Sequence, residues 1–238
     1  MLSNLKNIFK VPDLRNKILF TVMMVLLYRL GAHIRVPGID DQAVRQLRES
    51  AREQGALGFL NLFSGGAFSS FAIFALGIMP YISASIVMQL MTYVVPTFEQ
   101  MKKEGEAGRR KITQYTRFGA LGLALFQSFG IAVALEASAG LVINPGMGFR
   151  MTAVVSLTAG AMFLMWLGEQ ITERGLGNGI SILIFAGIAA GLPSALGGLF
   201  ELVRTGAMNP LISMLIIVVV ALVTYFVVFV ERGQRKIW

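Results

Sequence analysis

Six long apolar stretches follow one another along the 238-residue chain. Five of them, at residues 71–95, 118–135, 151–167, 179–199 and 211–230, contain no Asp, Glu, Lys or Arg. Because a bilayer core about 30 Å thick requires roughly 20 mostly apolar residues per helix, each predicts a membrane-spanning helix. A sixth, weaker stretch at 18–32 carries Arg29 near its end, where a long side chain can reach the membrane surface. The pattern predicts an all-α polytopic membrane protein with six transmembrane helices.

Composition supports this class and excludes several kinds of chemistry. Hydrophobic residues make up 55% of the chain and charged residues 14%, against about 45–50% and 25% in an average soluble protein. The chain has no cysteine, and His33 is its single histidine. Disulfide frameworks, Cys/His zinc sites, thiol nucleophiles and histidine-based triads are therefore excluded or nearly so. We expect no metal, no cofactor and no enzymatic activity.

Lysine and arginine are divided unevenly between the two sides of the predicted membrane. If the N-terminus is cytoplasmic, fourteen of the 21 lie on the cytoplasmic side and six on the other, with Arg29 inside the first span. The excess of positive charge on cytoplasmic loops therefore predicts that both termini are cytoplasmic. The densest basic cluster, at residues 102–111, is most simply a determinant of topology that contacts anionic lipids, although it also suits a dedicated partner site.

The five clear spans lack the intramembrane charges that pumps and ion-coupled transporters use as relays. Glu169 and Glu173, four residues apart, suggest paired carboxylates, but the adjacent Arg174 favours an ion pair at the helix end. The glycine-rich run 175–179 has neither the preceding strand nor the lysine of a phosphate-binding loop, so it predicts a tight turn between two helices. A small-solute secondary transporter and a membrane-insertion scaffold remain alternatives to a channel at this point.

Two features of the apolar pattern are unusual. Residues 61–70 form a semi-apolar segment interrupted by Gly and Ser, without charge, which predicts a short re-entrant element beside a cavity. Two isoleucine pairs, Ile78 with Ile82 and Ile180 with Ile184, are spaced four residues apart, so each pair lies on one helix face. Spacing alone favours ordinary packing or lipid contact for these side chains. Hydrophobic constrictions nevertheless close some pores without any charge.

Several motifs lie in a fixed order along the chain: FSGGA at 63–67, IFALGIMPYISAS at 73–85, KEGE with GRRK within 103–111, GEQITERG with GNGIS within 168–181, and ERGQR at 231–235. Together they resemble the SecY family, the protein-conducting channel subunits of the bacterial Sec translocon. That family has ten spans in two inverted halves of five. The resemblance implies that residues 1–199 form an N-terminal half-channel and that residues 200–238 form the sixth span and the start of a cytoplasmic loop, with the C-terminal half absent.

The resemblance also implies roles for individual residues. Ile78, Ile82, Ile180 and Ile184 match a hydrophobic pore ring, and Ser83 with Gln127 match the polar side of a lateral gate. The re-entrant segment matches a plug that blocks the resting channel, made of Leu60, Asn61, Leu62, Phe63, Ser64, Gly65, Gly66, Ala67, Phe68, Ser69 and Ser70.

The implied function is a passive gated channel that moves unfolded secretory polypeptides across the cytoplasmic (inner) membrane and releases membrane segments laterally into the bilayer. The implied partners are SecE, SecG, SecA or the ribosome, and polypeptides that carry a signal sequence. Apart from ribosome docking, we expect no recognition of nucleic acid by this chain.

Overall fold

The computed structural model describes residues 11–40, 42, 44, 70–137, 140–206 and 208–232. Within these ranges the regular structure is helical, apart from two isolated bridges that pair Arg35 with Ala72 and Ile39 with Val142. The helices are α2 (Pro12–Gly31), α5 (Met79–Val94), α6 (Pro96–Lys103), α7 (Glu106–Ala137), α8 (Met147–Arg174), α9 (Gly179–Arg204) and α10 (Pro210–Glu231). The chain divides into two compact units, Met1–Ala190 and Gly191–Trp238.

Four of the described helices, α7, α8, α9 and α10, are long and apolar enough to cross a membrane, and the bent pair α5 and α6 raises this number to five if it forms one span. The all-helical prediction is therefore confirmed. The first predicted span, residues 18–32, overlaps α2 up to Gly31 and ends at the C-cap, Ala32; α2 has 20 residues. Every 18-residue stretch of α2 includes at least three charged side chains, so this span stays a prediction.

The second predicted span begins later than its apolar pattern indicated. Residues 71–78 form turns, and helix α5 starts only at Met79. Gly77 has a left-handed φ of 59°, and Pro80 lies in the first helical turn, where its missing N–H removes no helical hydrogen bond. At the other end, Pro96 begins α6 after a bend of 96°. Hydropathy alone cannot register these interruptions.

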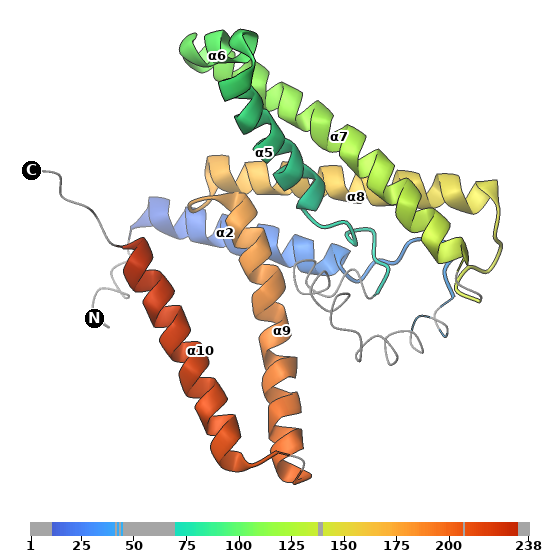
Figure 1. Ribbon diagram of the computed structural model, residues 1–238, viewed down its shortest axis with the longest axis vertical. Helices are drawn as coiled ribbons and strands as arrows, with labels where there is room; N and C mark the ends of the chain where they lie inside the picture. Colours follow the sequence, from blue (N-terminus) through green and yellow to red (C-terminus); the bar gives the residue numbers. More distant parts are fainter. Residues whose placement is uncertain are drawn as a thin grey trace, which may run out of the picture. The chain divides into compact units, whose positions relative to one another are not determined.

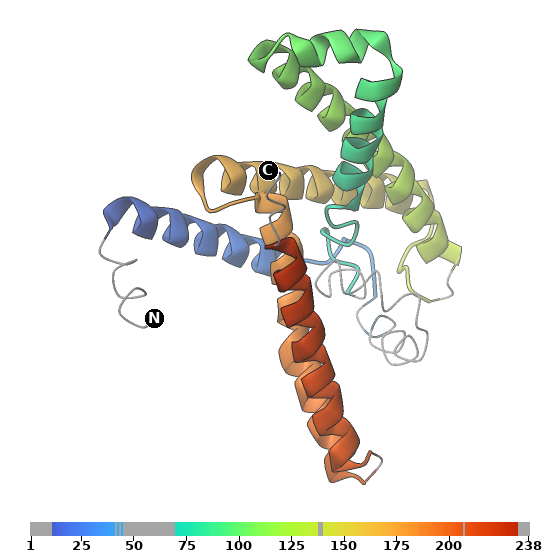
Figure 2. The ribbon, with the colours of Figure 1, turned by 60° about the vertical axis from the view of Figure 1, so that its left-hand side comes forward.

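In the first unit, α5 and α7 form a hairpin whose tip is α6 (Figures 1 and 2). Helix α7 contacts α5 and α8, and α2 contacts α8. Five of the buried residues of α7 have small side chains and recur at intervals of four: Thr116, Ala120, Ala124, Ser128 and Ala132. Small residues let helix backbones approach closely, as is typical of helices that pack within membranes.

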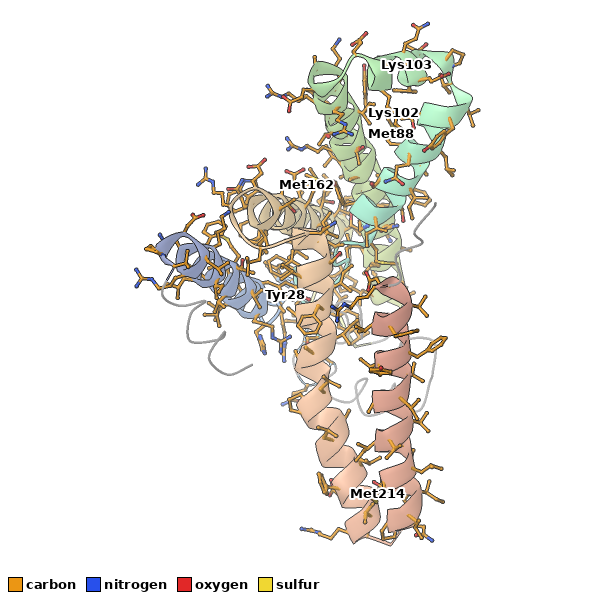
Figure 3. All side chains as sticks on the ribbon, turned by 90° about the vertical axis from the view of Figure 1, so that its left-hand side faces the viewer. Tyr28, Met88, Lys102, Lys103, Met162 and Met214 are labelled. Atoms are coloured by element: carbon orange, nitrogen blue, oxygen red, sulfur yellow. The ribbon has the colours of Figure 1, made fainter. Side chains whose placement is uncertain are left out.

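The second unit contains the end of α9 and the whole of α10. Gly206, with a φ of 74°, lies in the turn between them, and Asn209 caps α10 by accepting a hydrogen bond from the Leu211 amide at 3.0 Å. The structure describes every residue of α10, and of these only Ser213 is buried. Its apolar side chains project outward all around the helix (Figure 3). A helix that is apolar on all faces and exposed suits a lipid environment.

Candidate functional site

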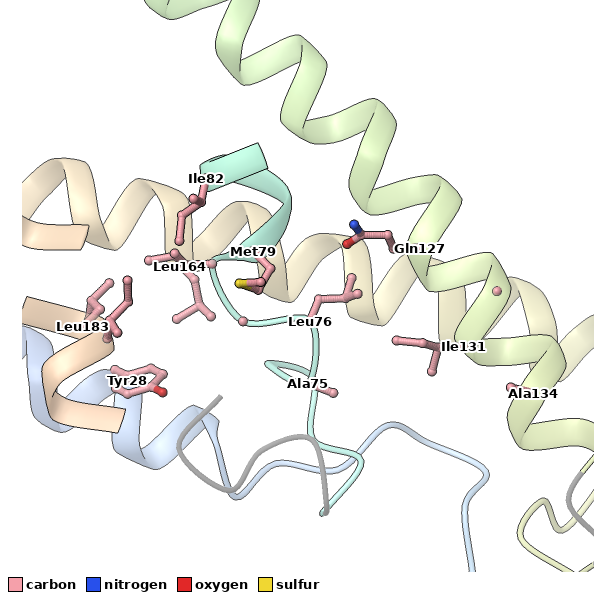
Figure 4. A pocket seen from close by; sticks show the side chains of 14 residues that line it. Tyr28, Ala75, Leu76, Met79, Ile82, Gln127, Ile131, Ala134, Leu164 and Leu183 are labelled. Atoms are coloured by element: carbon pink, nitrogen blue, oxygen red, sulfur yellow. The ribbon is translucent and has the colours of Figure 1, made fainter. Parts of the chain in front are cut away.

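A cavity of about 420 Å³ lies in the first unit and receives side chains from six parts of the chain (Figure 4). Helix α2 contributes Tyr28, and residues 75–79 pass along one wall into α5. Gln127 and Ile131 project from α7, and α8 and α9 complete the lining. Among the described residues, none that lines this cavity carries a charge. The cavity therefore presents an aliphatic surface with two polar side-chain groups, the Tyr28 hydroxyl and the Gln127 amide.

The structure brings the predicted ring isoleucines together. Ile78, Ile82 and Ile184 line the cavity, although they come from α5 and its N-cap and from α9, about 100 positions apart in the sequence. Ile180 does not line it but packs against the same hydrophobic cluster, which includes Ile78 and Leu183. Ile78 is buried, with 7% exposure, and the other three are half-buried. The two pairs thus meet in one place, which sequence spacing alone did not establish.

The remaining predicted site residues are distributed differently. Gln127 lines the cavity, whereas Ser83 is half-buried on α5 and is not among the lining residues. Of the predicted plug, residues 60–69 lie outside the described residues, and Ser70 is half-buried at the start of the described segment.

Sequence reasoning missed several cavity residues, notably Tyr28, Leu76, Leu164 and Leu183. Leu183 and Leu164 are nearly inaccessible, at 2% and 1% exposure. Because these residues belong to stretches that are apolar along most of their length, hydropathy does not separate a face that lines a cavity from a face that contacts lipid. Tyr28 offered the best signal, since it is an aromatic residue with a polar tip inside an apolar run.

The predicted tight turn between α8 and α9 is confirmed. Gly177 has a φ of 60°, and Asn178 caps α9 by accepting hydrogen bonds from the amides of Ile180 at 3.0 Å and Ser181 at 3.4 Å. Thr21 of α2 ties this turn to the first helix, because its hydroxyl accepts a hydrogen bond from the Leu176 amide at 3.1 Å. The entry to α9, and with it Ile184, is thus connected to both α8 and α2.

The prediction for Glu169 is corrected. Its carboxylate neither pairs with Glu173 nor forms an ion pair with Arg174, which follows Glu173; it accepts a hydrogen bond from Arg117 of α7 at 2.9 Å. The Glu169 side chain is 16% exposed and that of Arg117 47%. Arg174 lies five residues after Glu169, outside the i+3 and i+4 spacings at which side chains of one helix meet, whereas Arg117 reaches the carboxylate from α7. Glu173 instead lines a hollow of about 530 Å³ with Arg109, Arg110 and Arg117.

Two lysines of the basic cluster, Lys102 and Lys103, contact neighbouring side chains at the tip of the α5–α7 hairpin (Figure 3). The Lys102 ammonium lies 4.6 Å from the centre of the Tyr93 ring, which favours a cation–π contact. Lys103 donates to Glu99 at 2.7 Å, and this hydrogen bond lowers the pKa of the Glu99 carboxyl below its ordinary value. Among the described residues, no group of three or more His, Cys, Asp or Glu is arranged to hold a metal ion.

Comparison with known proteins shows which family has this sequence and fold. The SecY family profile matches residues 72–238, which is more than half of the chain. The chain belongs to the SecY family. It is 57% identical over 228 residues to the protein translocase subunit SecY of Escherichia coli K12, and 53% identical to that of Pseudomonas aeruginosa. These alignments cover 94% and 95% of this chain but 51% of each relative, so the chain spans about half the length of these SecY proteins.

Two solved structures share the fold of this SecY family member. One is described as the structure of a protein conducting channel, and the other as Sec61 in the canine ribosome-channel complex from the endoplasmic reticulum. Each has a TM-score of 0.65 and 18% sequence identity. They cover 97% and 98% of this chain, and 52% and 53% of the respective solved chains. The SecY relatives, together with the apolar helices of this chain, identify a multi-pass membrane protein.

Proposed function

We propose that residues 1–199 form the N-terminal half of a passive, gated channel for unfolded polypeptides, and that residues 200–238 provide its sixth span and the start of the following loop. The observation that carries this proposal is the uncharged cavity at which Ile78, Ile82 and Ile184 meet. The names of the relatives, protein translocase subunits, favour a polypeptide as the transported substrate.

Aliphatic side chains suit this task for a physical reason. A ring of isoleucines excludes ions because water does not wet a narrow apolar constriction. The same side chains form no directional hydrogen bonds, so they can contact any passing sequence without selecting it. We propose that Ile78, Ile82, Ile180 and Ile184 form one part of such a seal and that the other half of a full-length channel supplies the rest.

The other predicted roles complete the proposal. Ser83 and Gln127 form the polar side of a lateral gate, and residues 60–70 form a plug. The chain has six spans and lies in the cytoplasmic membrane with both termini in the cytoplasm. It works with SecE, SecG and signal-sequence-bearing polypeptides, while SecA or the ribosome supplies the driving force. The channel itself is not an enzyme.

A cysteine crosslink tests the polypeptide path directly. The 238 residues contain no cysteine, so a single introduced thiol has no background within them. We expect that Ile184→Cys in the full-length channel forms a disulfide with a cysteine in a stalled secretory chain. Val219→Cys in α10 is the control, because Val219 is apolar and exposed and does not line the cavity. If an engaged chain fails to crosslink at Ile184, the path lies elsewhere and the isoleucines serve packing alone.

Transport of small solutes is the competing function, and uptake by liposomes separates the two. A secondary transporter shows saturable solute uptake, whereas a polypeptide channel shows none. A membrane-insertion scaffold needs no pore, so measurable ion conductance in a plug-deleted channel counts against that alternative.

A further inference from the structure

The non-helical segment 71–78, which leads into α5, is held firmly in place. Its backbone pairs with the chain that follows α2: the Val36 amide donates to the Phe71 carbonyl at 3.0 Å, and the Ile73 amide donates to the Ile34 carbonyl at 2.9 Å. Ala72, between these two bonds, has no exposed surface. An irregular segment with its backbone groups paired and its side chains buried has few ways to move independently.

Phe74 is the most deeply embedded large side chain of this segment, with 2% exposure. Its ring stacks on Tyr28 of α2 with centroids 6.2 Å apart, and on Phe163 of α8 with centroids 5.9 Å apart. The ring planes are nearly parallel in both pairs, at 16° and 10°. Phe74 is therefore stacked between the two helices and joins them through aromatic contacts.

Two glycines provide the space for this arrangement. A Cβ atom at Gly31 of α2 would lie 2.1 Å from Cε2 of Phe74, and one at Gly160 of α8 would lie 2.0 Å from the Ile73 carbonyl oxygen. Both distances are far shorter than van der Waals contact. A side chain at Gly31 therefore requires the Phe74 ring to move, and one at Gly160 requires the backbone at Ile73 or α8 to move. By contrast, a Cβ at Gly122 of α7 would meet no atom within 4 Å.

A short, hydrogen-bonded path connects Phe74 to the ring isoleucines. The Gly77 amide donates to the Phe74 carbonyl at 2.8 Å, and Ile78 follows as the N-cap of α5. The Ile82 amide then donates to the Ile78 carbonyl at 3.1 Å, which closes the first helical turn. Phe74 and Ile78 also belong to the same buried cluster. The place where Phe74 is held therefore sets where α5 begins and where its two isoleucines enter the cavity.

We propose that Phe74 is a positioning residue, and that its fit between Gly31 and Gly160 fixes Ile78 and Ile82 at the cavity in the closed channel. The inference rests on the proposed function, because it assigns a purpose to the position of the ring. A positioning role differs from an ordinary role in the core. Loosening the contacts of Phe74 raises the ion leak, whereas an equally destabilising change elsewhere in the buried cluster that contains Phe74 and Ile78 does not.

Resting ion conductance of the full-length channel in planar bilayers tests the proposal. We expect Gly31→Ala and Phe74→Leu each to raise the resting conductance several-fold, with Gly122→Ala unchanged. Leucine lacks the Cε2 and Cζ atoms that the new methyl group of Gly31→Ala would overlap, so the double variant Gly31→Ala/Phe74→Leu should leak less than either single variant. Ile171→Ala is the stability control, because Ile171 is fully buried in the same cluster without lining the cavity.

The outcomes separate this inference from the function on which it rests. If Ile82→Gly leaks while Phe74→Leu conducts like the unmodified channel, the positioning role is overturned and the ring stands. If Ile82→Gly does not leak, both the ring and the inference fail. A leak from Ile171→Ala as large as that from Phe74→Leu shows that general loosening is responsible, which also overturns the inference. Phe74→Leu introduces no steric overlap because leucine is smaller than phenylalanine. Its resting conductance therefore tests the positioning role even if the Gly31→Ala channel fails to assemble.

Discussion

At the scale of single residues, a buried hydroxyl pair joins the long helices α7 and α8. Ser128 of α7 and Thr158 of α8 lie with their oxygens 3.0 Å apart, and Ser128 also donates to the Ala124 carbonyl at 2.6 Å. Thr158 is therefore the donor of the interhelical bond. We expect Ser128→Ala to lower the free energy of unfolding by about 0.6 kcal/mol, and at most about 1.7 kcal/mol, the range found for such bonds between membrane helices. Unfolding of the purified channel in detergent measures this, and a double-mutant cycle with Thr158→Val should show that the two losses are not additive.

The ring isoleucines give a second prediction at this scale. Replacing Ile184 by Gly removes a whole side chain from the cavity, and we expect the resting ion conductance to rise because the apolar constriction widens. Ile182→Gly is the matched control: it lies on the same helix, packs against the same cluster and does not line the cavity. Both changes carry the same helix penalty of about 1 kcal/mol. Equal conductance of the two variants in bilayer recordings would argue that Ile184 only supports packing.

Single residues also show which contacts of the candidate site could be predicted from the sequence and which could not. The spacing of Ile78 and Ile82, and of Ile180 and Ile184, placed each pair on one face, and the resemblance to SecY proteins joined the pairs. The partner of Glu169 was missed because Arg117 lies 52 positions away in the sequence. Contacts of that separation depend on how α7 crosses α8, which no local pattern encodes.

At the scale of elements, two of the three glycines in the turn between α8 and α9, Gly177 and Gly179, are required for different reasons. Gly177 has a left-handed φ of 60° with open space around it, whereas a Cβ at Gly179 would lie 2.0 Å from the Gly168 carbonyl oxygen. We expect Gly177→Asn to be tolerated, since asparagine adopts this conformation, and Gly177→Ala to cost about 1 kcal/mol. Gly179→Ala should be the most destabilising, because backbone must move. Thermal unfolding of the three variants tests this order, and a Gly179→Ala variant as stable as Gly177→Asn would contradict the packing of α8 against α9.

Element boundaries followed hydropathy where helices are uninterrupted. The predicted spans 179–199 and 211–230 lie within α9 and α10, and 118–135 within α7. Prediction was poorer at 71–95, because the chain remains apolar through a segment that is not helical. The side chains of residues 71–78 are buried among α2 and α8 instead of facing lipid. Apolar side chains are favoured both inside a protein and inside a bilayer, so hydropathy does not distinguish the two. Gly77 and Pro80 were the available signals.

At the scale of the whole molecule, the alternation of loops across the membrane yields a prediction that tests the spans one at a time. Lys103, Asn144, Arg174 and Thr205 are exposed positions that lie between successive helices α6 to α10 or at their ends. In a full-length protein freed of other cysteines, we expect Asn144→Cys and Thr205→Cys to react with an impermeant maleimide added outside intact spheroplasts. Lys103→Cys and Arg174→Cys should react only from the cytoplasmic side, because the lysine and arginine excess lies there.

Each neighbouring pair of these positions is separated by one helix: α7, α8 or α9. Two neighbouring positions that label from the same side would therefore show that the helix between them does not span. A complete reversal of the pattern would leave all three spans in place and invert the orientation instead. The experiment thus distinguishes the number of crossings, which follows from helix length and apolarity, from their direction, which follows from the positive charges that the α5–α7 tip and the end of α8 carry.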